Sequence, residues 1–302
     1  MTVNPTAYEQ YLLELMNWAR ANPLAEANFL GIDLNQALPP GTISPTPKQP
    51  LALNAELIIA ARAHSQWMLA TDTFSHTGIN GSTPRERIEA AGYKLIPPWS
   101  VGENIAWNGT TGGLDLVNSV LTAHEGLFRS AGHRINLLED DFKEVGLGFI
   151  PGQFTAGSTT YNAGMVTQKF AYSGHISYLT GVILDDLNGN GFYDVGEGVG
   201  GVSITAMGTT GTFSTQSWGA GGYNLALPNG SYTVTYSYAG QELTSDVLIA
   251  GRNVKLDVFL DDMGGGSGGD VIYGTSGHDD LFGTAGDDLF VGSAGNDFID
   301  GG

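Results

Sequence analysis

Apolar residues in the first part of the chain recur at helical and then at strand spacing. In residues 5–30, Tyr8, Leu12 and Leu15 lie three or four positions apart, which places them on one face of a helix. Asn54 is a favourable N-cap for a second helix, and Thr83-Pro84 favours the start of a third. The predicted helices cover residues 5–30, 55–71, 83–92 and 114–127, and the predicted strands cover residues 144–150 and 160–172. Residues 1–172 are therefore predicted to form an α+β domain.

Residues 173–262 have a different pattern, in which short stretches of alternating apolar and polar residues are separated by turn residues. The predicted strands cover residues 202–206, 223–227 and 232–238. Pro228-Asn229-Gly230 has the composition of a turn between the last two strands. Short strands at regular spacing predict a small all-β sandwich.

Residues 263–302 contain a nine-residue repeat that begins at Gly265. Each unit offers a glycine for a bend, an apolar residue for a core and an aspartate; these aspartates are Asp270, Asp279, Asp288 and Asp297. The period is typical of a calcium β-roll, in which each turn supplies oxygen ligands, and the segment resembles the RTX, or hemolysin-type, calcium repeats. The sequence stops at Gly301-Gly302, the opening of a further unit, so we expect the repeats to continue beyond it.

Acidic residues are concentrated in the second half of the chain. The formal net charge is −19; residues 1–172 contain 15 acidic and 10 basic side chains, net −5, and residues 173–302 contain 16 and 2, net −14. This distribution argues against nucleic acid and anionic membranes as partners and favours bound cations. Cysteine is absent, which excludes disulfides and thiol chemistry. No apolar run approaches the roughly 18 residues of a transmembrane segment.

Several separated segments of residues 1–172 carry a family resemblance. They are Asn17–Arg20, Ala63–Met68, Phe74–Gly78, Gly102–Ala106 and Ser130–Leu137. Their order and spacing resemble a bacterial member of the CAP superfamily, which contains cysteine-rich secretory proteins, antigen 5 and pathogenesis-related 1 proteins. The resemblance spans about residues 8–170. It implies an α-β-α sandwich (SCP-like domain) with a cleft, in which His76 and His133 are the cleft histidines and Glu103 is the acidic residue beside them.

The implied cleft residues suit metal chemistry only in part. Two neutral imidazoles can hold Zn²⁺, and a nearby carboxylate can deprotonate a bound water, but catalytic zinc sites normally have three protein ligands. The family's second cleft glutamate is replaced here by Ser130. His124 and Glu125, earlier in the same segment, are possible substitutes. The candidate catalytic residues are therefore His76, Glu103, His133 and Glu125, and the candidate zinc ligands are His76, His133 and His124.

A twelve-residue segment of the second domain has the spacing of a calcium-binding loop. It places oxygen side chains at positions 1, 3, 5, 9 and 12, a glycine at position 6 and a main-chain carbonyl at position 7. The predicted calcium ligands are Asp186, Asn188, Asn190, Phe192, Asp194 and Glu197. Strand patterns flank the loop, so residues 176–262 resemble the B-type repeat domains of bacterial adhesins. The alternative is a turn rich in Asn, Gly and Asp that binds no metal.

Together these features predict a secreted bacterial protein stabilised by calcium, with the CAP-like domain as its effector. Three functions remain open: a binding module for a lipid, peptide or glycan, a metal-dependent hydrolase of protease type, and a structural or adhesive surface protein without turnover. The first residues lack the charge and apolar pattern of a signal peptide. The RTX resemblance nevertheless implies an extracellular location, reached through type I secretion.

Overall fold

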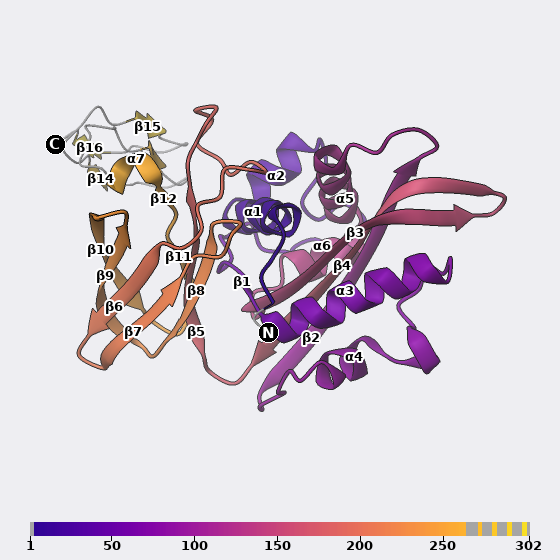
Figure 1. The fold of residues 1–302 in the computed structure, drawn as a ribbon, viewed down its shortest axis with the longest axis horizontal. Helices are drawn as coiled ribbons and strands as arrows, with labels where there is room; N and C mark the ends of the chain where they lie inside the picture. The colour runs from indigo at the N-terminus through magenta and orange to yellow at the C-terminus, as the bar shows by residue number, and fades with distance from the viewer. Residues whose placement is uncertain (1–2, 264–270, 274–279, 283–288, 292–297, 301–302) are drawn as a thin grey trace.

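The computed structural model describes residues 3–263, together with residues 271–273, 280–282, 289–291 and 298–300 (Figure 1). The first half of the chain is built on a four-stranded sheet with the strand order β1-β3-β4-β2. Its strands are β1 (Ala52–Leu53), β2 (Trp99–Thr110), β3 (Glu144–Ala156) and β4 (Thr159–Ser173). β4 is antiparallel to β2 and β3, and β1 is parallel to β3. The mixed helix and sheet content confirms the α+β prediction for this half.

Helices cover both faces of this sheet (Figure 1). The helical elements are α1 (Ala7–Ala21), α2 (Pro23–Phe29), α3 (Ala55–Ala70), the 3-10 turn η1 (Ile79–Gly81), α4 (Pro84–Ala90), α5 (Leu116–Arg129) and α6 (Ala131–Leu137). α3 and α4 lie on one face, where Leu57 and Ile88 share a small apolar cluster with Ala171 of β4. α1 and α5 lie on the other face and form the largest apolar cluster with Leu147 and Val166.

The sequence pattern predicts one helix over residues 5–30, but the structure contains two. The helical backbone is interrupted at Asn22, where φ is −132° and ψ is 63°, and Pro23 occupies the first turn of α2. Proline disfavours a helical conformation in the residue before it and has no N–H to continue the hydrogen-bond ladder. The prediction of a single helix was therefore wrong, and Asn22-Pro23 sets the boundary.

Two glycines of β3 allow α3 to pack directly on the sheet. A Cβ atom at Gly146 would overlap the main chain of Leu57, and one at Gly148 would lie 2.5 Å from the carbonyl carbon of Ala61. Both glycines lie on the same side of the strand because they are two residues apart. The close approach of α3 thus depends on the absence of side chains at these positions.

The strands of residues 177–259 form two further sheets. One has the order β10-β9-β6-β7, and the other has the order β11-β5-β12 with β8 also paired to β5. The strands are β5 (Ser177–Leu184), β6 (Ser203–Gly208), β7 (Gly211–Gln216), β8 (Gly222–Leu227), β9 (Gly230–Tyr238), β10 (Gln241–Ile249), β11 (Val254–Lys255) and β12 (Val258–Phe259). Buried residues from both sheets, among them Ile183, Ile204 and Val234, form one apolar cluster.

The two halves are joined by hydrogen bonds as well as by the chain. Lys143 follows α6 in the chain. Its ammonium group donates to the main-chain oxygens of Ile176 (3.0 Å) and Gly251 (2.8 Å). The Asn253 amide donates to the main-chain oxygens of Pro50 (2.9 Å) and Lys143 (2.7 Å). Both donors are buried. The junction is therefore a set of polar contacts between main chain and buried side chains.

Short parallel strands lie within the repeat region. After α7 (Leu260–Met263), β13 (Val271–Tyr273) pairs with β15 (Leu289–Val291), and β14 (Asp280–Phe282) pairs with β16 (Phe298–Asp300). The partners Val271 and Leu289 are 18 residues apart (289 − 271), which equals two repeat units. The predicted β-roll ligands Asp270, Asp279, Asp288 and Asp297 lie outside the described residues.

Candidate functional site

Glu103 lies at the centre of the candidate site, on β2. The antiparallel register of β2 and β4 places Lys169 directly opposite Glu103, so the two side chains share one face of the sheet. Their charged groups form an ion pair, and both side chains are almost completely buried. The carboxylate therefore has a permanent positive partner within the sheet itself.

Arg87 of α4 supplies a second cation to the same carboxylate. Its Nη2 atom lies 2.7 Å from Glu103 Oε2 and also donates to the main-chain oxygen of His76 at 2.9 Å. Its Nη1 atom donates to the main-chain oxygen of Ser82 at 2.6 Å. Thr83 starts α4 with a capping box in which Glu86 returns a hydrogen bond, and Pro84 fills the first turn. Arg87 thus fixes the loop that carries His76 to the sheet.

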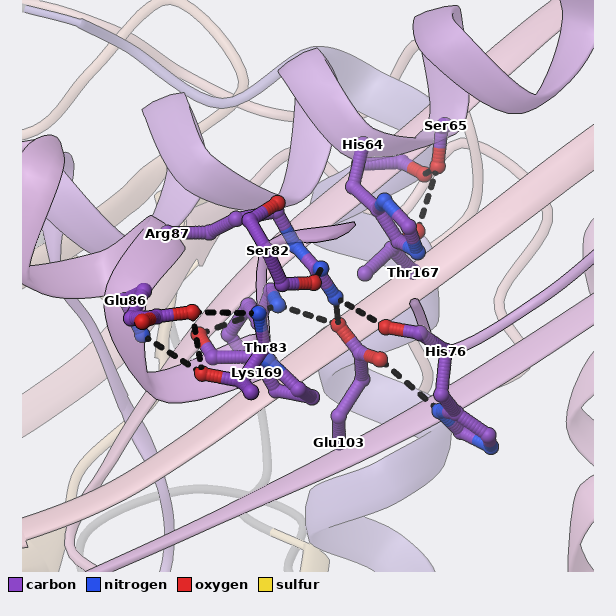
Figure 2. A network of polar contacts seen from close by, with 12 residues as sticks. His64, Ser65, His76, Ser82, Thr83, Glu86, Arg87, Glu103, Thr167 and Lys169 are labelled. Carbon is purple, nitrogen blue, oxygen red and sulfur yellow. Dashed lines mark hydrogen bonds and ion pairs between the residues drawn. The ribbon is translucent and has the colours of Figure 1, made fainter. Parts of the chain in front are cut away.

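His76 completes the contacts of Glu103 (Figure 2). Its Nδ1 atom lies 2.8 Å from Glu103 Oε1, and 52% of its side chain is exposed, compared with 2% for Glu103. A neutral imidazole that donates from Nδ1 keeps an acceptor lone pair on Nε2. The geometry therefore orients His76 through a buried carboxylate and leaves its other nitrogen for a ligand. We refer to His76, Arg87, Glu103, His133 and Lys169 as the Glu103 site.

The carboxylate and the ammonium of the Glu103 site are both charged near neutral pH. Burial raises the pKa of Glu103, but the charge and hydrogen bond of Lys169, together with Arg87 and His76, hold that pKa below the ordinary value of 4.5. Burial lowers the pKa of Lys169 to about 8, although Glu103 opposes this change. The folded pKa of Glu103 is depressed, so its stabilising contribution is present above pH 4.5 and is lost as the pH falls through the folded value.

His133 approaches the same site from α6. Its main-chain oxygen accepts a hydrogen bond from Asn104 at 3.1 Å, and Asn136 of the same helix donates to Asn104 Oδ1 at 2.9 Å. Burial lowers the pKa of His133, and the charge that His76 carries when protonated lowers it further. No partner of His133 Nδ1 is found in the described part of the chain. His133 is therefore a neutral imidazole that can still accept or donate one hydrogen bond.

The donor set does not fit a catalytic zinc ion. Glu103 Oε1 accepts from His76, and Glu103 Oε2 accepts from both Arg87 and Lys169. The carboxylate is therefore not free to bind a metal or to deprotonate a water. Across residues 3–263 and the short repeat strands, no group of three or more His, Cys, Asp or Glu side chains is arranged to hold a metal ion. The two imidazoles alone fall short of the usual three ligands.

His124 and Glu125 are placed on the side of α5 that faces α2. The Nε2 atom of the buried His124 lies 3.1 Å from Glu26 Oε1. Glu125 lines a pocket of about 570 Å³ together with His124 and Phe29. The polar contact of His124 is thus made with α2. Ser130 lies at the junction between α5 and α6.

His64 is a buried neighbour of the Glu103 site. Its Nε2 atom lies 3.0 Å from the main-chain oxygen of Ser75, and its ring stacks on Trp67 with 5.6 Å between centroids. Burial lowers the pKa of His64 to about 4, and the charge of Glu103 only partly opposes this change. The ring is therefore neutral in the folded protein at pH values above about 4.

We predict that His64 makes the protein less stable as the pH falls from 6.5 to about 4. In this window the unfolded chain binds a proton at His64 that the folded chain does not, so the free energy of unfolding decreases. His64→Gln removes the titrating group and is expected to flatten this part of the profile. Urea unfolding of both proteins at pH 7, 5.5 and 4.5 measures the difference, and equal slopes would show that His64 does not contribute.

The predicted calcium loop forms a tight turn around its acidic side chains. Asp186 Oδ2 accepts from the main-chain N–H of Gly191 at 2.8 Å, and Glu197 Oε2 accepts from that of Asp194 at 2.9 Å. Gly191, at loop position 6, has a φ of 70°, which a residue with a side chain rarely adopts. Asp194 Oδ2 lies 2.7 Å from the amide of Asn188 and 2.8 Å from that of Asn190. The predicted ligand side chains therefore lie within one loop, but Asp186, Asp194 and Glu197 accept hydrogen bonds from the loop itself and are not arranged as a metal-binding group.

The first half of the chain matches a known family. The model of the cysteine-rich secretory protein family, CAP, matches residues 13–170. The chain belongs to this family. A second model, the RTX calcium-binding nonapeptide repeat in four copies, matches residues 264–299. Both matches confirm the resemblances carried by the sequence, and the RTX match supports calcium binding by the repeats.

Several solved structures are similar to part of the chain. An extracellular protein with an SCP domain from Bacillus anthracis is 22% identical with a TM-score of 0.37, and the match covers 55% of this chain and 40% of that one. An outer surface protein from Borrelia burgdorferi is 16% identical with a TM-score of 0.35, over 58% of this chain and 98% of that one. Venom allergen-like protein 4 from Schistosoma mansoni is 11% identical with a TM-score of 0.32, over 56% and 91%.

No curated protein matches this CAP protein. Among the residues that the structure describes, no helix is long and apolar enough to cross a membrane.

Proposed function

We propose that this CAP protein is a secreted, calcium-binding bacterial protein whose CAP domain binds a ligand without chemical turnover. The observation that supports a binding role is the state of Glu103. Its carboxylate accepts hydrogen bonds from His76, Arg87 and Lys169, so it orients a histidine instead of acting as a base. The site then offers hydrogen-bonding groups on His76 and His133 to a ligand.

An apolar pocket beside the Glu103 site is consistent with ligand binding. The pocket, with a volume of about 260 Å³, lies between α3 and α4 and is lined by Trp67, Ile79 and Arg87. Arg87 belongs to both the pocket and the Glu103 site. A lipid, peptide or glycan with an apolar part and a hydrogen-bonding group suits this combination.

A metal inventory of the purified protein tests the binding role against hydrolysis. We expect calcium to be bound, and zinc to bind with less than one equivalent after dialysis and titration, because Glu103 is held by two cations. Hydrolysis of peptide and ester substrates should be absent with or without added zinc. One equivalent of zinc, together with hydrolysis that His133→Ala abolishes, would establish the hydrolase instead.

We further propose that residues 186–197 bind one calcium ion, in addition to the ions bound by the repeats. Glu197 is buried, and position 12 of such loops normally supplies two oxygens and a charge. Glu197→Gln is expected to remove one calcium equivalent in a calorimetric titration of the full chain. Glu242→Gln, on the exposed part of β10, is the matched control and should leave the stoichiometry unchanged. Equal stoichiometry of wild type and Glu197→Gln would show that the loop is a turn without metal.

A further inference from the structure

A second pocket lies where the CAP domain meets the β-strands that follow it. Its volume is about 680 Å³. Its wall comes from four separate parts of the chain: α1 with Asn22, β5, the loop of residues 186–197, and residues 255–259 of β11, β12 and the turn between them. α1 also packs on β8, where a Cβ atom at Gly222 would overlap the side chain of Gln10. The pocket is therefore a feature of the junction and not of either half alone.

The wall of this pocket contains more carboxylate groups than ammonium groups. Glu14 Oε2 of α1 lies 2.9 Å from the Lys255 ammonium, which also pairs with Asp257. Two carboxylates thus share one ammonium group, and Lys255 is the only Lys or Arg among the described residues that line the pocket. The side chain of Glu14 is 4% exposed, so its charge is held inside the protein. Burial raises the pKa of Glu14, Lys255 opposes this, and Asp257 adds to the rise.

A buried hydroxyl in the same wall lacks a partner. Tyr193 lines the pocket, is 2% exposed, and its hydroxyl has no hydrogen-bond partner in the described part of the chain. After burial itself, the negative charge of Glu14 is the largest influence that raises the pKa of Tyr193, so the hydroxyl lies within the field of that carboxylate. An unpaired buried hydroxyl costs free energy that a ligand can recover. The hydroxyl thus marks a position for a ligand atom in the wall that also contains Glu14.

Most of the remaining wall is aromatic or aliphatic, and Asn17 and Asn22 are its polar members. Trp18 and Phe192 lie edge to face, with 6.4 Å between their ring centroids, and Phe259 and Leu184 also line the pocket. Aromatic faces attract cations, and an excess of carboxylate over ammonium attracts them as well. An anion would meet unbalanced negative charge, and a neutral alcohol would leave that charge uncompensated.

We propose that this junction pocket binds a primary alkylammonium ligand. Its ammonium group donates hydrogen bonds to the Tyr193 oxygen and to the second lone pairs of the Glu14 and Asp257 carboxylate oxygens, whose first lone pairs accept from Gln10, Lys255 and the Val182 N–H. Its alkyl chain packs against Trp18, Phe192 and Phe259. The positive charge of the ligand supplies the second cation that the two carboxylates lack.

The probe for this proposal is n-butylammonium, titrated against the full chain at low ionic strength and followed by ligand-observed NMR. We expect saturable binding, with n-butanol and n-butyrate binding at least about tenfold more weakly because they lack the charge-assisted hydrogen bonds. Absence of saturable binding of n-butylammonium, or equal binding of the three probes, would overturn the proposal.

Two variants locate the bound probe. Asp257→Asn keeps the oxygen that accepts from the Val182 N–H, removes the charge, and should weaken n-butylammonium about tenfold. The matched control is Asp115→Asn. Asp115 does not line the pocket, and asparagine can still cap α5, so this variant should leave the affinity unchanged. Tyr193→Phe should also weaken the probe while leaving stability unchanged or higher, because the hydroxyl is unpaired without ligand. Equal affinities in Asp257→Asn and Asp115→Asn would place the probe elsewhere and overturn the assignment.

Discussion

Replacing Glu103 with glutamine should lower the free energy of unfolding by about 3–5 kcal/mol, because the change leaves two buried cations without their counter-charge. The Lys169 side chain is 1% exposed and that of Arg87 is 9% exposed, so water cannot replace the carboxylate. The size of glutamine is almost unchanged, which isolates the effect of charge. Urea unfolding at pH 7, where Glu103 and Lys169 are both charged, measures the loss.

The control for Glu103→Gln is Glu89→Gln on α4. Glu89 also pairs with an arginine, Arg85, at 3.2 Å, but both side chains are largely exposed. Exposed pairs one helical turn apart contribute about 0.3–0.5 kcal/mol, so this variant should unfold almost as the wild type does. If Glu103→Gln cost as little as Glu89→Gln, the network around Glu103 would not hold the site together.

Gly146→Ala should destabilise the protein by about 3 kcal/mol or more, because the added Cβ atom meets the main chain of α3 and not a mobile side chain. α3 would have to move away from β3, and this separation would open the apolar cluster around Leu57 and Ile88. Thermal and urea unfolding measure the effect, and reduced soluble yield is expected to accompany it.

Gly126→Ala is the matched substitution in α5. A Cβ atom at Gly126 has no neighbour within 4 Å, and alanine favours a helix interior over glycine by about 1 kcal/mol. This variant should therefore be more stable than the wild type. Similar stability of Gly146→Ala and the wild type would contradict the close packing of α3 on β3.

Helices α3 and α4 of the CAP domain could be predicted from the sequence because their local signals are strong. Asn54 accepts a hydrogen bond from the Leu57 N–H, and Thr83 starts α4 with a capping box, as N-cap residues do. β2 has no comparable signal. The alternation of apolar and polar residues is interrupted at Gly102, Glu103 and Asn104. The side chains of Glu103 and Asn104 form their hydrogen bonds and ion pairs with other protein groups and not with water, so their polarity does not mark an exposed face of the strand.

The candidate site was predictable only where the family motif names a residue. His76, Glu103 and His133 lie in motif segments, and the structure brings His76 and Glu103 into contact. Arg87 and Lys169 were not predicted. Lys169 is recognised as a partner only from the strand register that places it opposite Glu103, and Arg87 only from the packing of α4. Neither the register nor that packing is visible in the local sequence.

The polar junction around Lys143 and Asn253 holds the CAP domain and the β-strands in one relative orientation. Hydrogen bonds that involve the side chains of Gln49, Lys143, Asn224 and Asn253 hold residues 49–53 and 143 to residues 176–177, 224 and 251–253. Such contacts resist rotation of one half against the other. A hinge movement would break several buried hydrogen bonds, and water could not replace them. The β-strands and the CAP domain therefore behave as one rigid unit. The direction in which His76 faces is therefore fixed relative to these β-strands.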